Sequence, residues 1–319
     1  MVRFLVRRIA FGVVVMWLVA TIVFAMYFIA PHDVARTLAG KQASADTVAA
    51  IKHNLGLDRP TIVQYGSFLW KALHGDLGYS YANSESVTTL IGQGLPATAS
   101  LVVGGAILWL IMGVSTGVLA STRPRSVLDR TTTGIALFFY SMPTFLLGEA
   151  MLLVLFFRLH LAGIDWFPGA GYIPLTQDPL QWARYLVLPW LTIALVTAAT
   201  YVRLTRGSML DVMGEDYIRT ARAKGLRESR VVYRHGLRAA LTPVLTQFGI
   251  DVGTLLGGAI VTENVFGLPG LGELAINSLT KQDLPTIIGL VLLASALVVV
   301  ANILVDICYA LLDAKVRLS

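Results

Sequence analysis

Three carboxylates interrupt long apolar runs in this sequence of 319 residues: Glu149, Asp251 and Asp306. An ionisable side chain inside a membrane-spanning helix is expensive to bury, so each predicts either the wall of a polar path or a partner on a neighbouring helix. Asp306 lies close to the end of its run, beside Asp313 and Lys315, where its side chain can reach an aqueous interface. Glu149 and Asp251 lie deeper, and they are the candidates for lining a solute path. The alternative for both is a pairing with a neighbouring helix or with a second subunit.

Motifs that carry catalysis are absent from the sequence. It contains no GxxxxGK(S/T) loop, no HExxH and no GxSxG. The five histidines (32, 53, 74, 160 and 235) include no pair spaced i, i+4, which argues against a metal site. The single cysteine, Cys308, excludes an intramolecular disulfide and a CxxC site. We therefore expect no catalytic, cofactor-binding or metal-binding residue in this chain.

The composition indicates an integral membrane protein. Hydrophobic residues make up 55% of the chain and charged residues 14%, whereas soluble globular chains carry about 25% charged residues. The mean hydropathy is +0.70. A membrane span needs about 20 mostly apolar residues in a helix, and six runs meet this condition: Ile9–Ala30, Ala97–Ser121, Thr132–Phe157, Tyr185–Leu204, Leu241–Val265 and Pro285–Leu312. The predicted fold class is an all-α membrane protein with six transmembrane helices.

The first apolar run and the distribution of cations predict the topology. That run is longer than the apolar core of a signal peptide and lacks a clear cleavage site, so we interpret it as a retained anchor. Cytoplasmic loops carry an excess of Lys and Arg. Placing both termini in the cytoplasm assigns to that side seventeen of the 25 cations: 3, 7, 8, 123, 125, 130, 203, 206, 219, 222, 224, 227, 230, 234, 238, 315 and 317.

Three regions follow from these spans: an N-terminal anchor (1–30), an outside segment (31–96) and a transmembrane core (97–319). Within the outside segment we expect a short amphipathic helix over Val63–Leu73, followed by a turn at residues 75–78. Pro143 should bend the third span. Gly253, Gly257 and Gly258 should let the fifth span pack closely on another helix.

A basic segment, Gly214–Thr242, separates the fourth and fifth spans. Nine Lys and Arg lie between Arg203 and Arg238, and the pattern predicts two short helices broken at Gly225. Small residues before the break, Ala221 and Ala223, let another surface approach closely, and the flanking cations can pair with acidic groups. We therefore interpret the segment as a docking element. A nucleic-acid-binding helix-turn-helix is the weaker alternative, because the segment is too short for its own core and is joined to spans at both ends.

Residues 219–243, RTARAKGLRESRVVYRHGLRAALTP, resemble the EAA loop of membrane subunits of bacterial ABC importers, in the form found in the peptide/nickel permease family. Ala221, Gly225 and Pro243 match the small residue, the glycine and the proline of that loop, whereas Arg219-Thr220-Ala221 stands where the generic motif has Glu-Ala-Ala. Further stretches similar to that family are RFLVRRI at the N-terminus, LGLDRP, SMPTF and ENVFGLPGLGELAINS. Together they resemble the first permease of a heterodimer.

The resemblance implies an ATP-driven importer in the bacterial cytoplasmic membrane. Its partners would be a second homologous permease, two ABC ATPases that bind ATP and Mg, an extracytoplasmic solute-binding protein and the lipid bilayer, with no nucleic acid. Residues 206–240 would form a cytoplasmic coupling loop. The expected ATPase contacts in that loop are Glu215, Asp216, Tyr217, Arg219, Ala221, Arg222, Ala223, Gly225 and Leu226.

The cargo stays open at this point. Peptides are the commonest substrates of the family that the sequence resembles, and nickel and haem-like cargo also occur in it. No histidine falls in the middle of a predicted span, so nothing in the spans indicates a nickel cage. An ion-coupled secondary transporter is the alternative function, although the duplicated halves typical of such transporters are not found.

Overall fold

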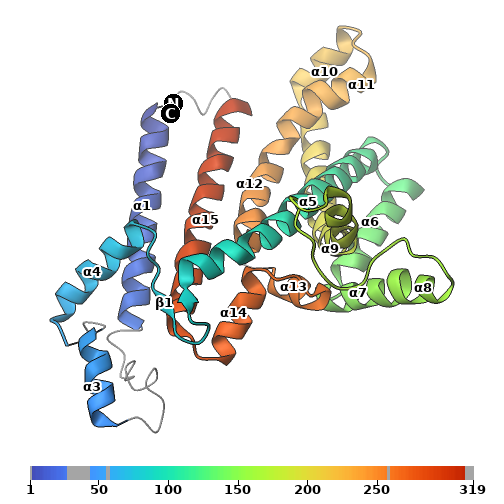
Figure 1. The fold of residues 1–319 in the computed structure, drawn as a ribbon. Helices are drawn as coiled ribbons and strands as arrows, with labels where there is room; N and C mark the ends of the chain where they lie inside the picture. The colour runs from blue at the N-terminus through green and yellow to red at the C-terminus, as the bar shows by residue number, and fades with distance from the viewer. Residues whose placement is uncertain (1, 27–43, 55–57, 257–258, 313–319) are drawn as a thin grey trace.

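The computed structural model describes residues 2–26, 44–54, 58–256 and 259–312. Four long helices and a fifth, shorter one form the body of the fold. They are α1 (Val2–Phe24), α5 (Val87–Thr122), α9 (Pro179–Met213), α15 (Leu284–Leu312) and α12 (Leu237–Leu256). In Figure 1, α1, α15 and α12 lie beside one another, whereas α5 runs obliquely across the view.

Short elements connect the long helices. Before α5 come α3 (Ala45–Asn54), α4 (Thr61–Leu73) and an antiparallel hairpin of β1 (Tyr79–Ser80) and β2 (Glu85–Ser86). Between α5 and α9 lie α6 (Val127–Tyr140), α7 (Thr144–Met151), the π-helix η2 (Leu152–Arg158) and α8 (Leu159–Leu161). After α9 follow α10 (Asp216–Ala223), α11 (Glu228–Arg230) and the π-helix η3 (Val231–Gly236). The last two short elements, which lie between α12 and α15, are α13 (Ile260–Phe266) and α14 (Leu271–Thr280).

Five helices of the described residues are long and apolar enough to cross a membrane, and the number is six if a bent pair is counted as one span. The five are Val6–Phe24, Val87–Thr122, Thr144–Leu161, Pro179–Met213 and Leu284–Ile307. The sixth joins Glu228–Leu255 to Ile260–Phe266 at an angle of 57°. The predicted all-α membrane fold is therefore confirmed.

Three of the predicted boundaries differ from the structure. The third run, Thr132–Phe157, is divided: α6 ends at Tyr140 and α7 begins after Pro143, which lacks a backbone N–H and prevents one continuous helix. The fifth run is divided between α12 and α13. The helix that follows the predicted outside segment begins before residue 97, because α5 begins at Val87 and includes Pro96. Residues 27–30 of the first predicted span lie outside the described residues.

Glycines set the closest helix contacts. A Cβ atom on Gly117 of α5 would lie 2.7 Å from Cβ of Thr205 and 2.9 Å from the carbonyl oxygen of Val202, both on α9. On Gly253 of α12 it would lie 3.3 Å from Cα of Val298 on α15. The predicted close packing at Gly253 is confirmed, whereas residues 257 and 258 lie outside the described residues.

The N-terminal helix α1 packs on α15 and on α4. The hydroxyls of Thr21 and Tyr65 are 2.6 Å apart, and the ring of Phe24 contacts Tyr65 and Phe68 of α4. The expected amphipathic helix is thus present as α4. The expected turn follows it, because Gly75 and Gly78 have positive φ angles of 76° and 97°.

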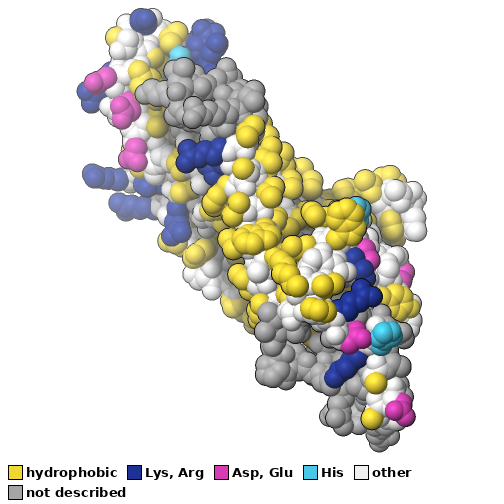
Figure 2. All heavy atoms as spheres, turned by 90° about the vertical axis from the view of Figure 1, so that its left-hand side faces the viewer, with side chains coloured by type: hydrophobic (Ala, Val, Ile, Leu, Met, Phe, Trp, Pro, Cys, Tyr) yellow, Lys and Arg dark blue, Asp and Glu magenta, His cyan; other side chains and the backbone are white. Residues whose placement is uncertain are grey.

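The two ends of the molecule differ. In Figure 1 the start of α1, the end of α15 and the pair α10–α11 lie at one end, whereas α3, α14 and the hairpin lie at the other. Figure 2 shows hydrophobic side chains in a band across the middle of the face that carries α1, with charged side chains above and below it. This is the surface that a bilayer-spanning protein presents.

Candidate functional site

The basic segment forms a helical projection at the end of α9. Most of the predicted contact residues lie on its outside: 215, 216, 217, 219, 222, 223 and 225 are exposed. The exposed fraction of Tyr217 is 46%. Ala221 is buried and Leu226 is half-buried, so these two side chains face the interior of the projection.

A small apolar core holds α10 on its base. Ile218, Ala221 and Val231 are buried together, and Val212, Met213 and Leu226 pack against them. Below this core, η3 carries Val232 and Gly236 into contact with the end of α9. A Cβ atom on Gly236 would lie 2.9 Å from the Met213 sulfur, and Val232 shares a cluster with Val118, Met209 and Ala240. The projection is therefore packed continuously onto α5, α9 and α12.

The predicted break at Gly225 is confirmed. Its φ angle is 72°, in the left-handed region that favours glycine. The N–H of Gly225 donates to the carbonyl of Arg222 at 2.9 Å, and the N–H of Leu226 donates to that of Ala221 at 3.4 Å. A Cβ atom at Gly225 would meet nothing within 4 Å. The turn thus leaves open space at the tip of the projection.

An ion pair crosses this turn. Arg222 donates from Nη2 to Oε1 of Glu228 at 2.7 Å. The Glu228 carboxylate raises the pKa of Arg222 above its ordinary value, chiefly through this hydrogen bonding. A second pair, Arg219 with Asp216, lies on the outer face of α10 at 3.2 Å.

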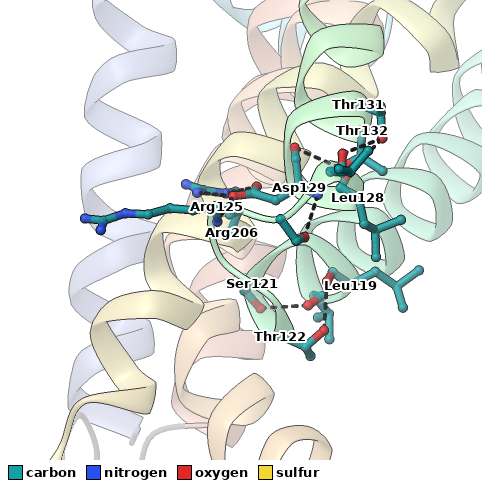
Figure 3. Close-up of polar contacts among 12 residues, drawn as sticks. Leu119, Ser121, Thr122, Arg125, Leu128, Asp129, Thr131, Thr132 and Arg206 are labelled. Atoms are coloured by element: carbon teal, nitrogen blue, oxygen red, sulfur yellow. Dashed lines mark hydrogen bonds and ion pairs between the residues drawn. The ribbon is translucent and has the colours of Figure 1, made fainter.

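A second polar centre lies where the α5–α6 turn meets α9 (Figure 3). Asp129 is buried, with 4% of the residue exposed, and accepts from Nε and Nη2 of Arg206 at 2.6 and 2.8 Å. It also accepts from the N–H of Arg125 at 2.8 Å. The φ angle of Arg125 is 64°. Hydrogen bonding from Arg206, and next from the Arg125 N–H, lowers the pKa of Asp129 to about 2. Ser126 caps α6 by accepting from the Asp129 N–H.

Sequence reasoning missed the partner of Asp129. It counted Arg206 only as a cytoplasmic cation, because a pairing between residues so far apart in sequence leaves no local pattern. The pair fixes the start of α6 to α9 near the base of the basic projection.

The intramembrane carboxylates occupy different environments. Asp251 of α12 accepts from the hydroxyl of Tyr201 on α9 at 2.8 Å and from Nε2 of Gln247 at 2.8 Å. Asp306 pairs with Arg8 at 3.1 Å, which joins α15 to α1. Glu149 is exposed on α7, next to Gly148, which packs on Val265 and Phe266 of α13.

A fourth carboxylate, Glu263, is fully buried in α13. It lies within the apolar run predicted as the fifth span, so the signal that singled out Asp251 was also present there. Among the described residues, no group of three or more His, Cys, Asp or Glu side chains could hold a metal ion.

Comparison with known proteins covers nearly the whole chain. Residues 110–318 match the model of the family described as binding-protein-dependent transport system inner membrane component, and residues 1–102 match the model of its N-terminal part. A protein of Brucella abortus named as a peptide transport system permease is 41% identical over 317 residues, covering 99% of both chains. The dipeptide transport system permease protein DppB of Escherichia coli K12 is 35% identical over 338 residues, again covering 99% of each.

Comparison with solved structures finds a similar fold in an ABC transporter. It is an inward-facing conformation of the MetNI methionine ABC transporter, with a TM-score of 0.55 and 19% identity, covering 70% of this chain and 96% of that one. At this identity the likeness concerns the fold alone. None of these relatives supports the ion-coupled alternative.

Proposed function

The chain belongs to the family of inner-membrane components of binding-protein-dependent transport systems, and we propose that it moves di- and oligopeptides into the cytoplasm as one permease of an ATP-driven importer. The peptide cargo is supported by the relatives named as peptide and dipeptide permeases, which align over 99% of this chain. That full-length similarity is the observation on which the proposal rests.

The basic projection is the proposed contact with a partner ATPase. The exposed residues Glu215, Asp216, Tyr217, Arg219, Arg222, Ala223 and Gly225 would form the contact surface. Ala221 and Leu226 would act from inside, because they pack in the core that holds α10 in place. ATP and Mg would bind the ATPase partners, whereas this chain would receive the resulting movement.

Packing supports the transmission of that movement. The coupling loop packs on the end of α9 through Met209 and Met213, and its last element, η3, runs into α12 without a break. A rigid displacement of the loop would therefore tilt α9 and α12 together. Such a tilt is the rigid-body switch between inward- and outward-facing states that alternating access requires.

The further partners follow from the same class of transporter. A second homologous permease would complete the path, and an extracytoplasmic solute-binding protein would deliver the peptide at the end of the molecule that carries α14 and the β1–β2 hairpin. The chain would lie in the bacterial inner membrane with both termini and the coupling loop in the cytoplasm. Their common position at one end of the fold supports this orientation (Figure 1).

Of the two predicted path residues, Glu149 is the one that we propose for the path, and for Asp251 we propose the alternative pairing role. The exposure of Glu149 on a membrane-spanning helix supports its role in the path, because lipid is a poor environment for a carboxylate. Both described hydrogen bonds of Asp251 come from within the chain, from Tyr201 and Gln247, which favours a pairing role for Asp251 over direct contact with cargo.

The proposal is tested by reconstituting the importer in lipid vesicles, with the binding protein outside and ATP with Mg inside. Di-, tri- and longer peptides are offered, and both uptake and ATP hydrolysis are measured with and without this chain. Peptide-stimulated hydrolysis and uptake that require the chain are the expected result. Uptake driven by an ion gradient without ATP would overturn the proposal.

A further inference from the structure

Glu263 lies where three helices meet, and its charge is satisfied without a cation among its described contacts. The residue is 0% exposed. Thr98 of α5 donates its hydroxyl to Oε1 at 2.6 Å. The backbone N–H groups of Gly272 and Glu273, at the start of α14, donate to Oε2 at 2.7 and 3.2 Å. A carboxylate at a helix N-terminus is stabilised by these N–H groups and by the helix dipole.

The first turn of α14 is thus capped by other helices. Its N-cap residue, Gly270, has no side chain to accept a hydrogen bond. The N–H of Leu271 donates instead to the hydroxyl of Thr98 at 2.8 Å, while Glu263 accepts from the next two N–H groups. Three of the four N–H groups that a helix start leaves unpaired are therefore satisfied by two side chains, one from α5 and one from α13.

Glycines make room for this carboxylate and account for the spacing in ENVFGLPGLGE. A Cβ atom on Gly270 would overlap the Glu263 carboxylate. On Gly272 it would lie 2.6 Å from Cα of Ile260 and 2.8 Å from Oε2 of Glu263. Gly267 ends α13 with a φ angle of 59°, which turns the chain back towards Glu263. The motif therefore builds a corner between α13 and α14 around one buried charge.

The α13–α14 corner also contacts parts of the chain other than α5. The carbonyl of Phe266 accepts from the N–H of Gly171 at 2.9 Å. On the other side of α13, a Cβ atom on Gly148 of α7 would lie 3.1 Å from Val265. By contrast, α12 is continuous with η3 and packs with the coupling loop through Ala240 and Val232.

We infer that Glu263 is a positioning residue that fixes the α13–α14 corner to α5, so that the two halves of the bent fifth span act differently during transport. The half formed by α12 follows the coupling loop. The half formed by α13 is held by Glu263 to α14 and to the Thr98 end of α5, whereas the coupling loop contacts α5 at Val118, towards its other end. We expect α12 to move relative to α13. This inference rests on the proposed coupling function.

The test compares isosteric variants in the reconstituted importer. Glu263→Gln keeps the shape but directs an NH2 group at N–H donors of α14 or Thr98. Thr98→Val keeps the shape and removes the hydroxyl that bridges Glu263 and Leu271, whereas Thr98→Ser retains it and serves as the matched control. Uptake and ATP hydrolysis are measured per assembled complex, and the number of ATP molecules hydrolysed per peptide is calculated.

Loss of a hydrogen bond to a buried charge predicts a decrease in uptake of about tenfold or more in Glu263→Gln and in Thr98→Val, with near-normal uptake in Thr98→Ser. Hydrolysis should continue, so that more ATP is consumed per peptide. The double variant should lose no more than either single variant, because both remove one shared network.

An unchanged number of ATP molecules per peptide in Glu263→Gln would overturn the inference. If the complex with Glu263→Gln fails to assemble, the number of ATP molecules hydrolysed per peptide in Thr98→Val tests the inference in the same way. A wild-type complex without ATP-dependent peptide uptake would instead contradict the proposed function, and this result is separate because it appears before any variant is made.

Discussion

Arg222 and Glu228 close the tip of the coupling loop across Gly225, with Nε to Oε2 at 3.1 Å and Nη2 to Oε1 at 2.7 Å. Their side chains are 43% and 59% exposed. An exposed pair of this kind contributes about 0–1 kcal/mol to stability. We therefore expect the pair to orient α10 relative to α11 rather than to hold the fold together.

Charge reversal tests that role. Arg222→Glu and Glu228→Arg should each reduce peptide uptake while leaving the thermal unfolding temperature almost unchanged, because each single change places like charges across the turn. The double variant should recover part of the uptake, because it restores the pair but not the proposed contact of Arg222 with the ATPase. Uptake assays and unfolding curves on the same preparations provide the comparison. Failure of the double variant to exceed either single variant would show that the orientation of α10 by this pair does not matter for uptake.

The open space around Gly225 permits a graded series at one position. Asn tolerates the left-handed region, so Gly225→Asn should keep most of the uptake, whereas Gly225→Ala should cost about 1–2 kcal/mol of local strain. Gly225→Trp should abolish uptake with normal membrane insertion, since the position lies at the exposed tip and a Cβ atom there would meet no described atom within 4 Å. Normal uptake by the Trp variant would show that no partner approaches the tip.

The Asp129–Arg206 pair predicts an acid-dependent loss of stability. The pKa of Asp129 in the folded chain is about 2, below its ordinary value of 3.8. The stability that this difference contributes is complete above pH 3.8 and is lost as the pH falls towards 2. Unfolding temperatures of the wild type measured from pH 7 to pH 2 should fall more steeply below pH 4 than those of Asp129→Asn.

A double variant provides the control for that pair. Arg206→Gln leaves Asp129 buried without its cation, so it should be less stable than the variant that also carries Asp129→Asn. Equal stability of the single and the double variant would show that water replaces the guanidinium at no cost.

Alanine variants of Gly117 and Gly207 distinguish the effect of close helix packing on stability from the effect of helix propensity. Gly117→Ala places a methyl group 2.7 Å from Thr205 and should cost about 1–3 kcal/mol by forcing α5 away from α9. Gly207→Ala makes the same chemical change in α9, where nothing lies within 4 Å, and should be neutral or stabilising by up to about 1 kcal/mol. Unfolding in detergent compares them. Equal effects would contradict the close α5–α9 contact.

Variants of Tyr201 and Asp251 test whether Asp251 pairs with α9 or lines the solute path. If the role of Asp251 is its hydrogen bond with Tyr201 on α9, Tyr201→Phe and Asp251→Asn should each lower the unfolding temperature. Their effects should not add in the double variant. Peptide preference should then be unchanged in both. A change of peptide preference in Asp251→Asn alone would instead place that carboxylate in contact with cargo.

The long helices could be predicted from the sequence because apolar length is a local property. The break at Gly225 and the helix α4 were also predictable from short-range turn and amphipathic patterns. The partners of Asp129 and Glu263 were not, because Arg206 and Thr98 lie 77 and 165 residues away from them. The bend at Pro143 was predicted from the proline, but not that α6 would end there as a separate helix. The division of the fifth run between α12 and α13 was not predicted, since its apolar composition is continuous.

The cap of α14 has a consequence for how the chain is made. Thr98 precedes Leu271 by 173 residues, so the ribosome has completed α5 long before the helix that needs it emerges. Glu263, the acceptor for Gly272 and Glu273, lies close by in sequence. The N–H of Leu271 and the second oxygen of Glu263 depend on the Thr98 hydroxyl, so the complete cap must wait until α5 and α13 meet in the membrane. The α13–α14 corner is therefore expected to form late in biogenesis, after insertion of the spans and not along with them.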